Sequence, residues 1–375
     1  MAEKKFSLKD QLFNAESLGA LSVEYAAGLP GFDAEAYTKA ALSGIADRSL
    51  VACLDWFADC LEPYLSTDFN EMADQLEATL PPPLDPTRKD DDFGKFVHSV
   101  PGVLAVRHGL EHHRDRALDL LYAATQRFSM ELYIRDFLNR WPNETLERMT
   151  AWAQDDNYHV RRLVSEGTRP KLPWARAISL APEDALLFLD TLHADGTRFV
   201  TRSVANHLND IAKIDPALVV ATLRRWREAQ KQNAKELDWM TRHALRTLIK
   251  QGDAGAMDLL GYRQDVDVKA DVRFAAQVVE IDGFLEFEVD LLADVDLPVV
   301  IDYRLTFARP SGKTGQKVFK LKTTKLKAGV PMTVSKRHRL IGDATTFTLH
   351  PGPHDVAVQI NGRICAEARF ELVAP

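Results

Sequence analysis

The sequence predicts a multidomain protein in which an all-α array of helical repeats is followed by a small all-β sandwich. Apolar residues recur at every third or fourth position up to about residue 262, and an arginine-centred motif returns every forty residues within that region. From about residue 263, apolar and polar residues alternate. The first pattern is typical of amphipathic helices and the last of half-buried strands. Because 375 residues are many for one hydrophobic core, we expect two domains, 1–262 and 263–375.

Helical spacing is clear in "YTKAALSGIADRSLVACLDWFADCLEPYL" (37–65). The segment "PPPLDPTRKDDDF" (81–93) is rich in proline and charge, which predicts a loop between helical segments. Pro182 and Pro216 suit the first turns of later helices, where the missing amide hydrogen costs nothing.

The forty-residue repeat is seen in "VRRLVSEGTRP" (160–170), "VTRSVANHLND" (200–210) and "MTRHALRTLIK" (240–250), which place Arg162, Arg202 and Arg242 in register. A helical period of this length predicts stacked HEAT-like helix pairs. At about 100° per residue, each copy puts apolar residues on one face and its arginine on the opposite face. Stacking would align these polar faces, and the arginines would then meet either duplex phosphates or acids of a neighbouring repeat.

Alternating strands are predicted at 284–295, 299–310, 317–329 and 354–372. Glycine-containing turns separate them, and the "NG" at 361–362 is a strong hairpin signal. About 110 residues of this kind predict an immunoglobulin-like sandwich.

Charge is unevenly distributed along the chain. Residues 1–100 hold 18 acidic and 8 basic residues, whereas residues 301–340 hold eleven basic residues and one acid. The basic stripe favours a nucleic-acid partner, although runs of lysine also occur on faces that are simply solvated. Lys313, Lys317 and Arg337 are its candidate DNA contacts.

Nothing in the sequence indicates a membrane or secretory destination. No apolar run approaches the roughly 20 residues of a membrane span, and the start lacks the pattern of a signal peptide. Three cysteines without a framework fit a reducing compartment. We therefore expect a cytoplasmic protein, and the lack of coiled-coil heptads is compatible with a monomer.

Three stretches resemble the DNA alkylation-repair glycosylases built from HEAT-like repeats, and most closely the AlkC branch. They are "FSMELYIRDFLNRWP" (128–142), "DNYHVRRLVSEGTRPKLPW" (156–174) and "FVTRSVANHLNDIAKIDP" (199–216). The resemblance implies a monofunctional base-excision-repair glycosylase that needs no cofactor or metal. It would release small cationic bases such as N3-methyladenine or N3-methylcytosine from double-stranded DNA, leaving an abasic site without deep base flipping.

The resemblance also suggests a catalytic set of Glu131, Glu166 and Asp210. A cationic base leaves without a strong general acid, while the sugar becomes positively charged and water must be positioned. We assign water activation to Glu166 or Asp210 and charge stabilisation to the others. The competing interpretation is surface ion pairing, of Glu131 with Arg135 and of Glu166 with Arg162.

The same motifs supply candidates for contact with the substrate. Trp174 and Tyr158 are expected at the lesion or its sugar. The DNA contacts expected from the helical region are Arg161, Arg162, Arg169, Arg202 and Arg242.

Two other functions compete with the glycosylase. "HGLEH" (108–112) fits the H-x-x-E-H pattern of zinc peptidases and lies in a stretch that reads as one amphipathic helix, but no third ligand is identified. A helical-repeat scaffold that binds DNA or protein without catalysis would also have this composition.

Overall fold

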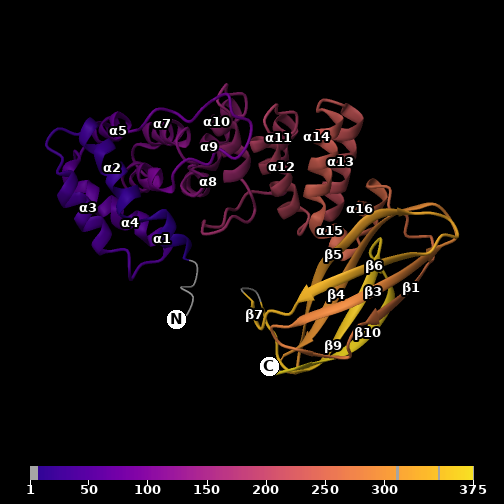
Figure 1. Cartoon of the computed structure of the whole chain (residues 1–375). Helices are drawn as coiled ribbons and strands as arrows, with labels where there is room; N and C mark the ends of the chain where they lie inside the picture. The colour runs from indigo at the N-terminus through magenta and orange to yellow at the C-terminus, as the bar shows by residue number, and fades with distance from the viewer. Residues whose placement is uncertain (1–6, 310–311, 345–346, 375) are drawn as a thin grey trace. The chain divides into compact units, whose positions relative to one another are not determined.

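A computed structural model describes residues 7–309, 312–344 and 347–374, and in it helices occupy the first part of the chain and strands the last (Figure 1). The α-helices are α1 (Leu8–Leu12), α2 (Ala15–Gly28), α3 (Ala34–Ser43), α4 (Leu50–Leu61), α5 (Phe69–Ala78), α6 (Val100–Leu104), α7 (Arg114–Thr125), α8 (Ile134–Arg140), α9 (Pro142–Trp152), α10 (Tyr158–Gly167), α11 (Pro182–Leu192), α12 (Arg198–Ile211), α13 (Pro216–Ala229), α14 (Ala234–Ala244), α15 (Arg246–Gln251) and α16 (Ala254–Leu259). The short helical turns are η1 (Glu62–Tyr64), η2 (Phe96–Ser99) and η3 (Ala105–Gly109).

The helix starts follow local sequence signals. Short polar side chains accept hydrogen bonds from free amides of the first turn at Asn14, Asp33, Ser49, Asp68 and Asn157. Pro182 and Pro216 open α11 and α13, as predicted. Between α5 and η2 the chain forms the expected loop over residues 81–93.

Two of the three repeat copies depart from a continuous helix. In the first copy α10 ends at Gly167, so Arg169 lies beyond the helix, because the residue before Pro170 is disfavoured in the helical conformation. In the third copy the chain leaves helical geometry at Leu245, between α14 and α15. The second copy lies wholly within α12.

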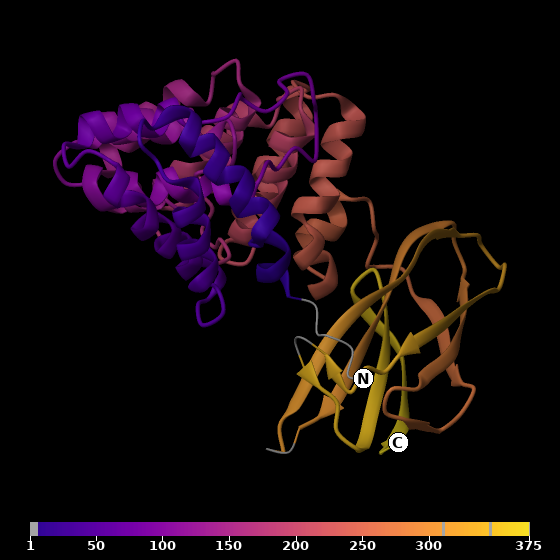
Figure 2. The ribbon, with the colours of Figure 1, turned by 60° about the vertical axis from the view of Figure 1, so that its left-hand side comes forward.

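The C-terminal strands form two main sheets, in which most neighbouring strands run antiparallel (Figure 2). One has the order β1-β3-β6 and the other β2-β10-β9-β4-β5, while β7 and β8 form a separate pair. The strands are β1 (Val268–Phe274), β2 (Val278–Glu280), β3 (Phe284–Ala293), β4 (Leu297–Ala308), β5 (Thr314–Leu326), β6 (Met332–Arg339), β7 (Asp343–Ala344), β8 (Phe347–Thr348), β9 (Gly352–Ile360) and β10 (Arg363–Val373). The alternation of apolar and polar residues predicted β3, β4, β5 and the β9–β10 hairpin but not the other strands.

The sandwich core forms from the alternate residues of each strand. Leu285, Phe287 and Val289 on β3 are buried, and so are Tyr303 and Leu305 on β4. The residues between those of β3 face outward, as the period of two requires. Two apolar inner faces pressed together give the core of a sandwich.

The chain divides into two compact units that do not coincide with the change from helix to strand. One unit holds residues 1–211 and 229–240, and the other holds residues 212–228 and 241–375. Met257 and Tyr262 pack against Val300 of β4, so the last helices share an apolar cluster with the sandwich. The expected division at residue 262 marks where helices give way to strands, and a domain boundary there stays a prediction.

Two glycines join the last helices to the sandwich. Gly252 ends α15 with a φ of 74°, and Gly362 follows Asn361 in the β9–β10 turn with a φ of 81°. A Cβ on Gly362 would lie 2.2 Å from the Cα of Gly252, and the Asn361 side chain donates to the Arg263 and Pro298 carbonyls. The "NG" turn is therefore both a hairpin turn and a packing contact. No helix in the described ranges is long and apolar enough to cross a membrane.

We expect Gly362→Ala to lower the free energy of unfolding by about 2–4 kcal/mol, because it adds a backbone clash to the strain of a positive φ. Gly329→Ala is the matched control: its φ is 69° but no atom lies within 4 Å of an added Cβ. Urea unfolding of both variants measures the difference. Equal losses would show that the contact with Gly252 contributes nothing.

Candidate active site

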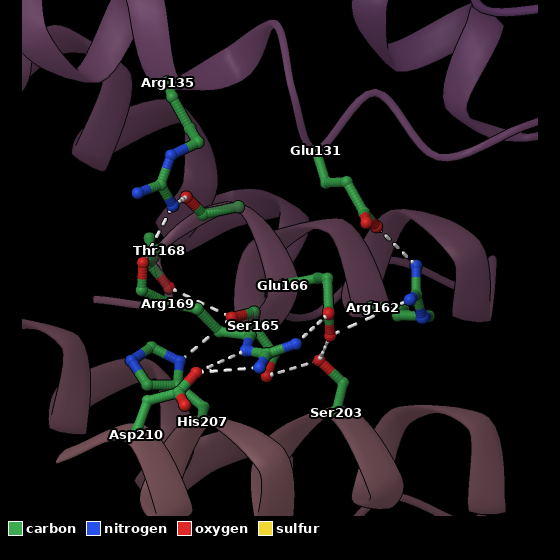
Figure 3. A network of polar contacts seen from close by, with 11 residues as sticks. Glu131, Arg135, Arg162, Ser165, Glu166, Thr168, Arg169, Ser203, His207 and Asp210 are labelled. Carbon is green, nitrogen blue, oxygen red and sulfur yellow. Dashed lines mark hydrogen bonds and ion pairs between the residues drawn. The ribbon is translucent and has the colours of Figure 1, made fainter. Parts of the chain in front are cut away.

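The three predicted carboxylates come from three separate elements. Glu166 lies in the last turn of α10 and Asp210 in the last turn of α12, and these two helices pack against each other. Glu131 lies in the turn that immediately precedes α8, and not on a helix with Arg135 as expected. Figure 3 shows that all three side chains point into one polar network.

Arginine 162 connects the first two carboxylates. Its Nη1 donates to Glu131 Oε2 at 2.9 Å, and its Nη2 lies 3.7 Å from Glu166 Oε2. The competing interpretation of an ion pair between Glu131 and Arg135 is wrong, because Glu131 pairs with Arg162. The pairing of Glu166 with Arg162 is present, and it is buried rather than at the surface.

Arginine 169 connects the second and third carboxylates. Its Nη1 donates to Glu166, and its Nε and Nη2 donate to Asp210 Oδ2 at 2.9 and 2.7 Å. Because Arg169 lies beyond the end of α10, its side chain can turn toward α12. The result is a chain of alternating charge in which three acids hold two arginines, with one formal negative charge in excess (Figure 3).

The polar faces of the first two repeat copies are buried or half-buried, not exposed as the sequence pattern suggested, whereas Arg242 in the third copy is exposed. Glu166 is 4% exposed, Asp210 6% and Arg162 9%. Burying a charge is costly unless it is paired and hydrogen-bonded, and here each of these groups has at least one partner of opposite charge.

The two glutamates differ in proton affinity. Burial raises the pKa of Glu131, opposed by Arg162 and assisted by the charge of Glu166. Burial also opposes ionisation of Glu166, but Arg162, Arg169 and the Ser203 hydroxyl outweigh it and hold the pKa of Glu166 below its usual range. Glu131 is thus the better base of the two, and Glu166 is the more firmly ionised.

A second layer of polar groups from α12 supports Glu166. The Ser203 hydroxyl donates to Glu166 Oε2 at 2.5 Å and lies 2.9 Å from the Ser165 hydroxyl. His207 Nδ1 lies 2.9 Å from the Ser165 carbonyl, so this nitrogen carries the proton. Ser203, His207 and Asp210 are spaced by four and three residues, which places them on one helical face. That spacing was the sequence signal by which Ser203 and His207 could have been found.

The buried Arg135 fixes the segment that carries Arg169. Its guanidinium donates to the carbonyls of Gly167, Arg169 and Arg176 at 3.0, 2.7 and 2.5 Å. A cation at the carboxyl end of a helix satisfies carbonyls that have no intrahelical partner. Arg135 therefore caps the carboxyl end of α10 and directs the residues that follow it toward α12.

Comparisons with known proteins match both parts of the chain. Residues 126–248 match the family described as "DNA alkylation repair enzyme", and residues 269–374 match the C-terminal Ig-like domain of YhaZ. YhaZ of Bacillus subtilis is 33% identical over 270 residues, which cover 71% of this chain and 74% of YhaZ. The structure of the alkylpurine DNA glycosylase AlkC of Pseudomonas fluorescens, bound to DNA containing an abasic site analogue, is 33% identical. It aligns over 98% of this chain and 100% of AlkC with a TM-score of 0.86.

The chain belongs to the AlkC-like DNA alkylation repair family. The matched region 126–248 contains every carboxylate and arginine of the alternating chain. The fold class predicted from the sequence, a helical region followed by an immunoglobulin-like sandwich, is confirmed for this AlkC-like protein.

The two aromatic candidates lie in opposite environments. Trp174 is 61% exposed and has a φ of 60°, in the segment after α10 that Arg135 anchors. Tyr158 is 2% exposed, and its hydroxyl donates to Asp92 and to the Asp85 carbonyl. A buried ring cannot reach a base without rearrangement, so the placement of Tyr158 does not support a contact with the lesion.

Most of the predicted phosphate contacts have partners inside the protein. Arg161 donates to both oxygens of Asp195, and Arg202 pairs with Asp90 and Asp91. In the second compact unit Arg242 donates to the Tyr262 hydroxyl. Pairing with acids, the alternative left open for the repeated arginines, thus describes Arg162 and Arg202.

The basic stripe of the AlkC-like protein's sandwich is more open to solvent. Lys313 is exposed, and the Nζ of Lys317 lies 5.0 Å from the centroid of the Phe347 ring. Arg337 of β6 pairs with Glu286 of the neighbouring strand β3. Their contact with DNA stays a prediction.

The "HGLEH" stretch does not form the single helix expected for a zinc motif. Residues 105–109 form a π-helical turn, and α7 begins only at Arg114, so His108 and His112 do not share a regular helix. Glu111 accepts from Arg140 at 3.0 Å, and His108 pairs with Glu62. Within the described part of the chain, no cluster of three or more histidine, cysteine, aspartate or glutamate residues is arranged to hold a metal.

Buried histidines should make this site sensitive to acid. Burial lowers the pKa of His207 to about 4, below the ordinary value of 6.5. Between these values the unfolded chain binds more protons than the folded one, so stability present above pH 6.5 is lost as pH falls toward 4, by about 3 kcal/mol.

Urea unfolding at pH 7 and pH 4.5 measures this loss. We expect His207→Asn, whose amide can still donate to the Ser165 carbonyl, to lose less stability over this range than the wild type. An identical loss in both proteins would rule out His207 as a source of the acid sensitivity.

Proposed function

We propose that this protein is a monofunctional DNA glycosylase that hydrolyses the N-glycosidic bond of small cationic alkylated bases in double-stranded DNA, such as N3-methyladenine or N3-methylcytosine. The product is an abasic site. The observation that carries the proposal is the convergence of three carboxylates, those of Glu131, Glu166 and Asp210, on one polar network. Such a site favours a cationic base and the positively charged sugar that forms as the bond breaks.

Glu131 is proposed to activate water. Its pKa is raised, its side chain is 21% exposed, and the side chains of Glu166 and Asp210 are each only 6% exposed. Both oxygens of Glu166 already accept hydrogen bonds. This exchanges the roles expected from the sequence: Glu166 and Asp210 stabilise positive charge while Glu131 receives the proton of water.

The dense pairing within this polar network also bears on how the protein reaches the damaged base. Its members are paired with one another and largely buried, so a base drawn deep among them would have to displace these contacts. We therefore propose that water attacks the anomeric carbon of the sugar, and the base leaves, without the base being drawn far out of the duplex. AlkC of Pseudomonas fluorescens was captured on DNA with an abasic site analogue, the kind of product this reaction leaves.

The test is release of methylated bases from methylating-agent-treated duplex DNA, resolved by chromatography under single-turnover conditions. We expect Glu131→Gln and Glu166→Gln each to slow release at least about a hundredfold, or roughly 2.7 kcal/mol of barrier. Glu147→Gln, an exposed glutamate on α9, is the matched control and should release bases at the wild-type rate.

The pH dependence separates the two roles. If Glu131 is the base, wild-type activity falls as pH drops through its raised pKa, and Glu131→Gln removes that limb from the residual activity. The residual activity of Glu166→Gln should still fall as pH drops through the pKa of Glu131. Salt-sensitive duplex binding without any release by the wild type would instead indicate a DNA-binding scaffold.

A further inference from the structure

A short acidic segment, residues 89–94, places an exposed aromatic ring beside the active site. The segment lies in the loop between α5 and η2, and its Phe93 is 51% exposed. Single exposed apolar side chains are common on protein surfaces, so a role for Phe93 depends on how its ring is held and on what lies beside it.

The segment is fixed to the body of the protein at both ends. The Phe199 amide donates to the Lys89 carbonyl at 2.9 Å. Gly94 has a φ of 69°, and a Cβ there would lie 1.9 Å from the Arg127 carbonyl oxygen, so the chain passes where only glycine fits. Phe93 is therefore presented by a constrained backbone.

Three consecutive aspartates hold the segment between these ends. Asp90 and Asp91 lie 2.7 and 2.9 Å from the two terminal nitrogens of Arg202, which is more than a hundred residues away in sequence. Asp92 accepts from the Tyr158 hydroxyl at 3.1 Å. Arg202 and Tyr158, both expected to touch DNA, thus support this segment.

The Phe93 ring lies next to the catalytic charges. The centroid of the Phe93 ring is 5.1 Å from that of the buried Phe199 ring. The guanidinium carbon of Arg162 lies 6.0 Å from the Phe93 centroid. Arg162 in turn holds Glu131 at 2.9 Å. Arg162 therefore lies between the exposed Phe93 ring and Glu131, the carboxylate proposed to activate water.

We propose that Phe93 is a base-contacting residue, whose ring stacks on a DNA base that neighbours or opposes the excised one. The proposal rests on the proposed glycosylase function. Aromatic faces bind unstacked bases of any sequence, and proteins that kink a duplex insert apolar side chains between base steps. The adjoining aspartates are paired with Arg202 and Arg88, so the exposed group that this segment offers to DNA is the apolar ring, which suits a base rather than a phosphate.

The binding test uses a duplex with a stable abasic-site analogue and 2-aminopurine, a base whose fluorescence falls when it stacks, placed opposite or beside the analogue. We expect fluorescence at one of these two positions to fall when the wild type and Phe93→Trp bind, and to stay high with Phe93→Ala. Leu187→Ala, which removes an equally apolar side chain that is 70% exposed on α11, should behave as the wild type.

The second readout is release of methylated bases. Phe93→Ala should slow single-turnover release by about tenfold, the size of effect expected from losing one base–aromatic stack, and Phe93→Trp should restore it. Because the ring is exposed, thermal melting of Phe93→Ala should match that of the wild type. Wild-type fluorescence and release rates in Phe93→Ala would overturn the proposal.

A double variant, Asp90→Asn with Asp91→Asn, tests the supporting role of the aspartates. It should reproduce the loss of 2-aminopurine quenching seen with Phe93→Ala. If it binds the abasic duplex more tightly and releases bases faster, the segment is a barrier to DNA and the stacking role is overturned. A wild type that quenches 2-aminopurine but releases no base would refute the glycosylase and leave the contact by Phe93 standing.

Discussion

The side-chain bridge made by Arg169 is the interaction on which the rest of the helical region depends. Glu166 and Asp210 are both buried acids from different helices, and without the cation that they share, the protein would lose stability or one of them would take up a proton. Arg169 can occupy that place only because α10 stops at Gly167 and Arg135 holds the segment that follows. The ion pairs that hold α10 against α12 are therefore also the ones that set the charge of the site.

The sequence was sufficient for the architecture because periodicity reports directly on which face is buried. Helices opened at Pro182 and Pro216, and the "NG" turn joined two strands, as local rules require. Local rules could not show that α13, α15 and α16 group with the sandwich, since that depends on contacts such as Tyr262 with Val300. Short strands such as β2 were missed because three residues carry no measurable period.

The site was predicted only as a set of residue types. The motifs drew attention to Glu131, Glu166 and Asp210, and the structure brings them together. The helical wheel, however, treated the arginine face as open to solvent, because amphipathicity does not distinguish a solvated polar face from a buried, paired one. Partnerships such as Arg202 with Asp91 span more than a hundred residues and leave no trace in sequence spacing.

The contact between Gly252 and Gly362 has a consequence for the order of folding. Gln264 donates to the Asn361 carbonyl across 97 residues, and the turn at 361–362 lies near the end of the chain. Contacts of such long sequence separation form late, because the intervening loop must close first. During synthesis, α15 and α16 therefore emerge from the ribosome well before their partner turn exists. Met257 can meet Val300 of β4 earlier, whereas Gly252 has no Gly362 to pack against until the β9–β10 turn has been made.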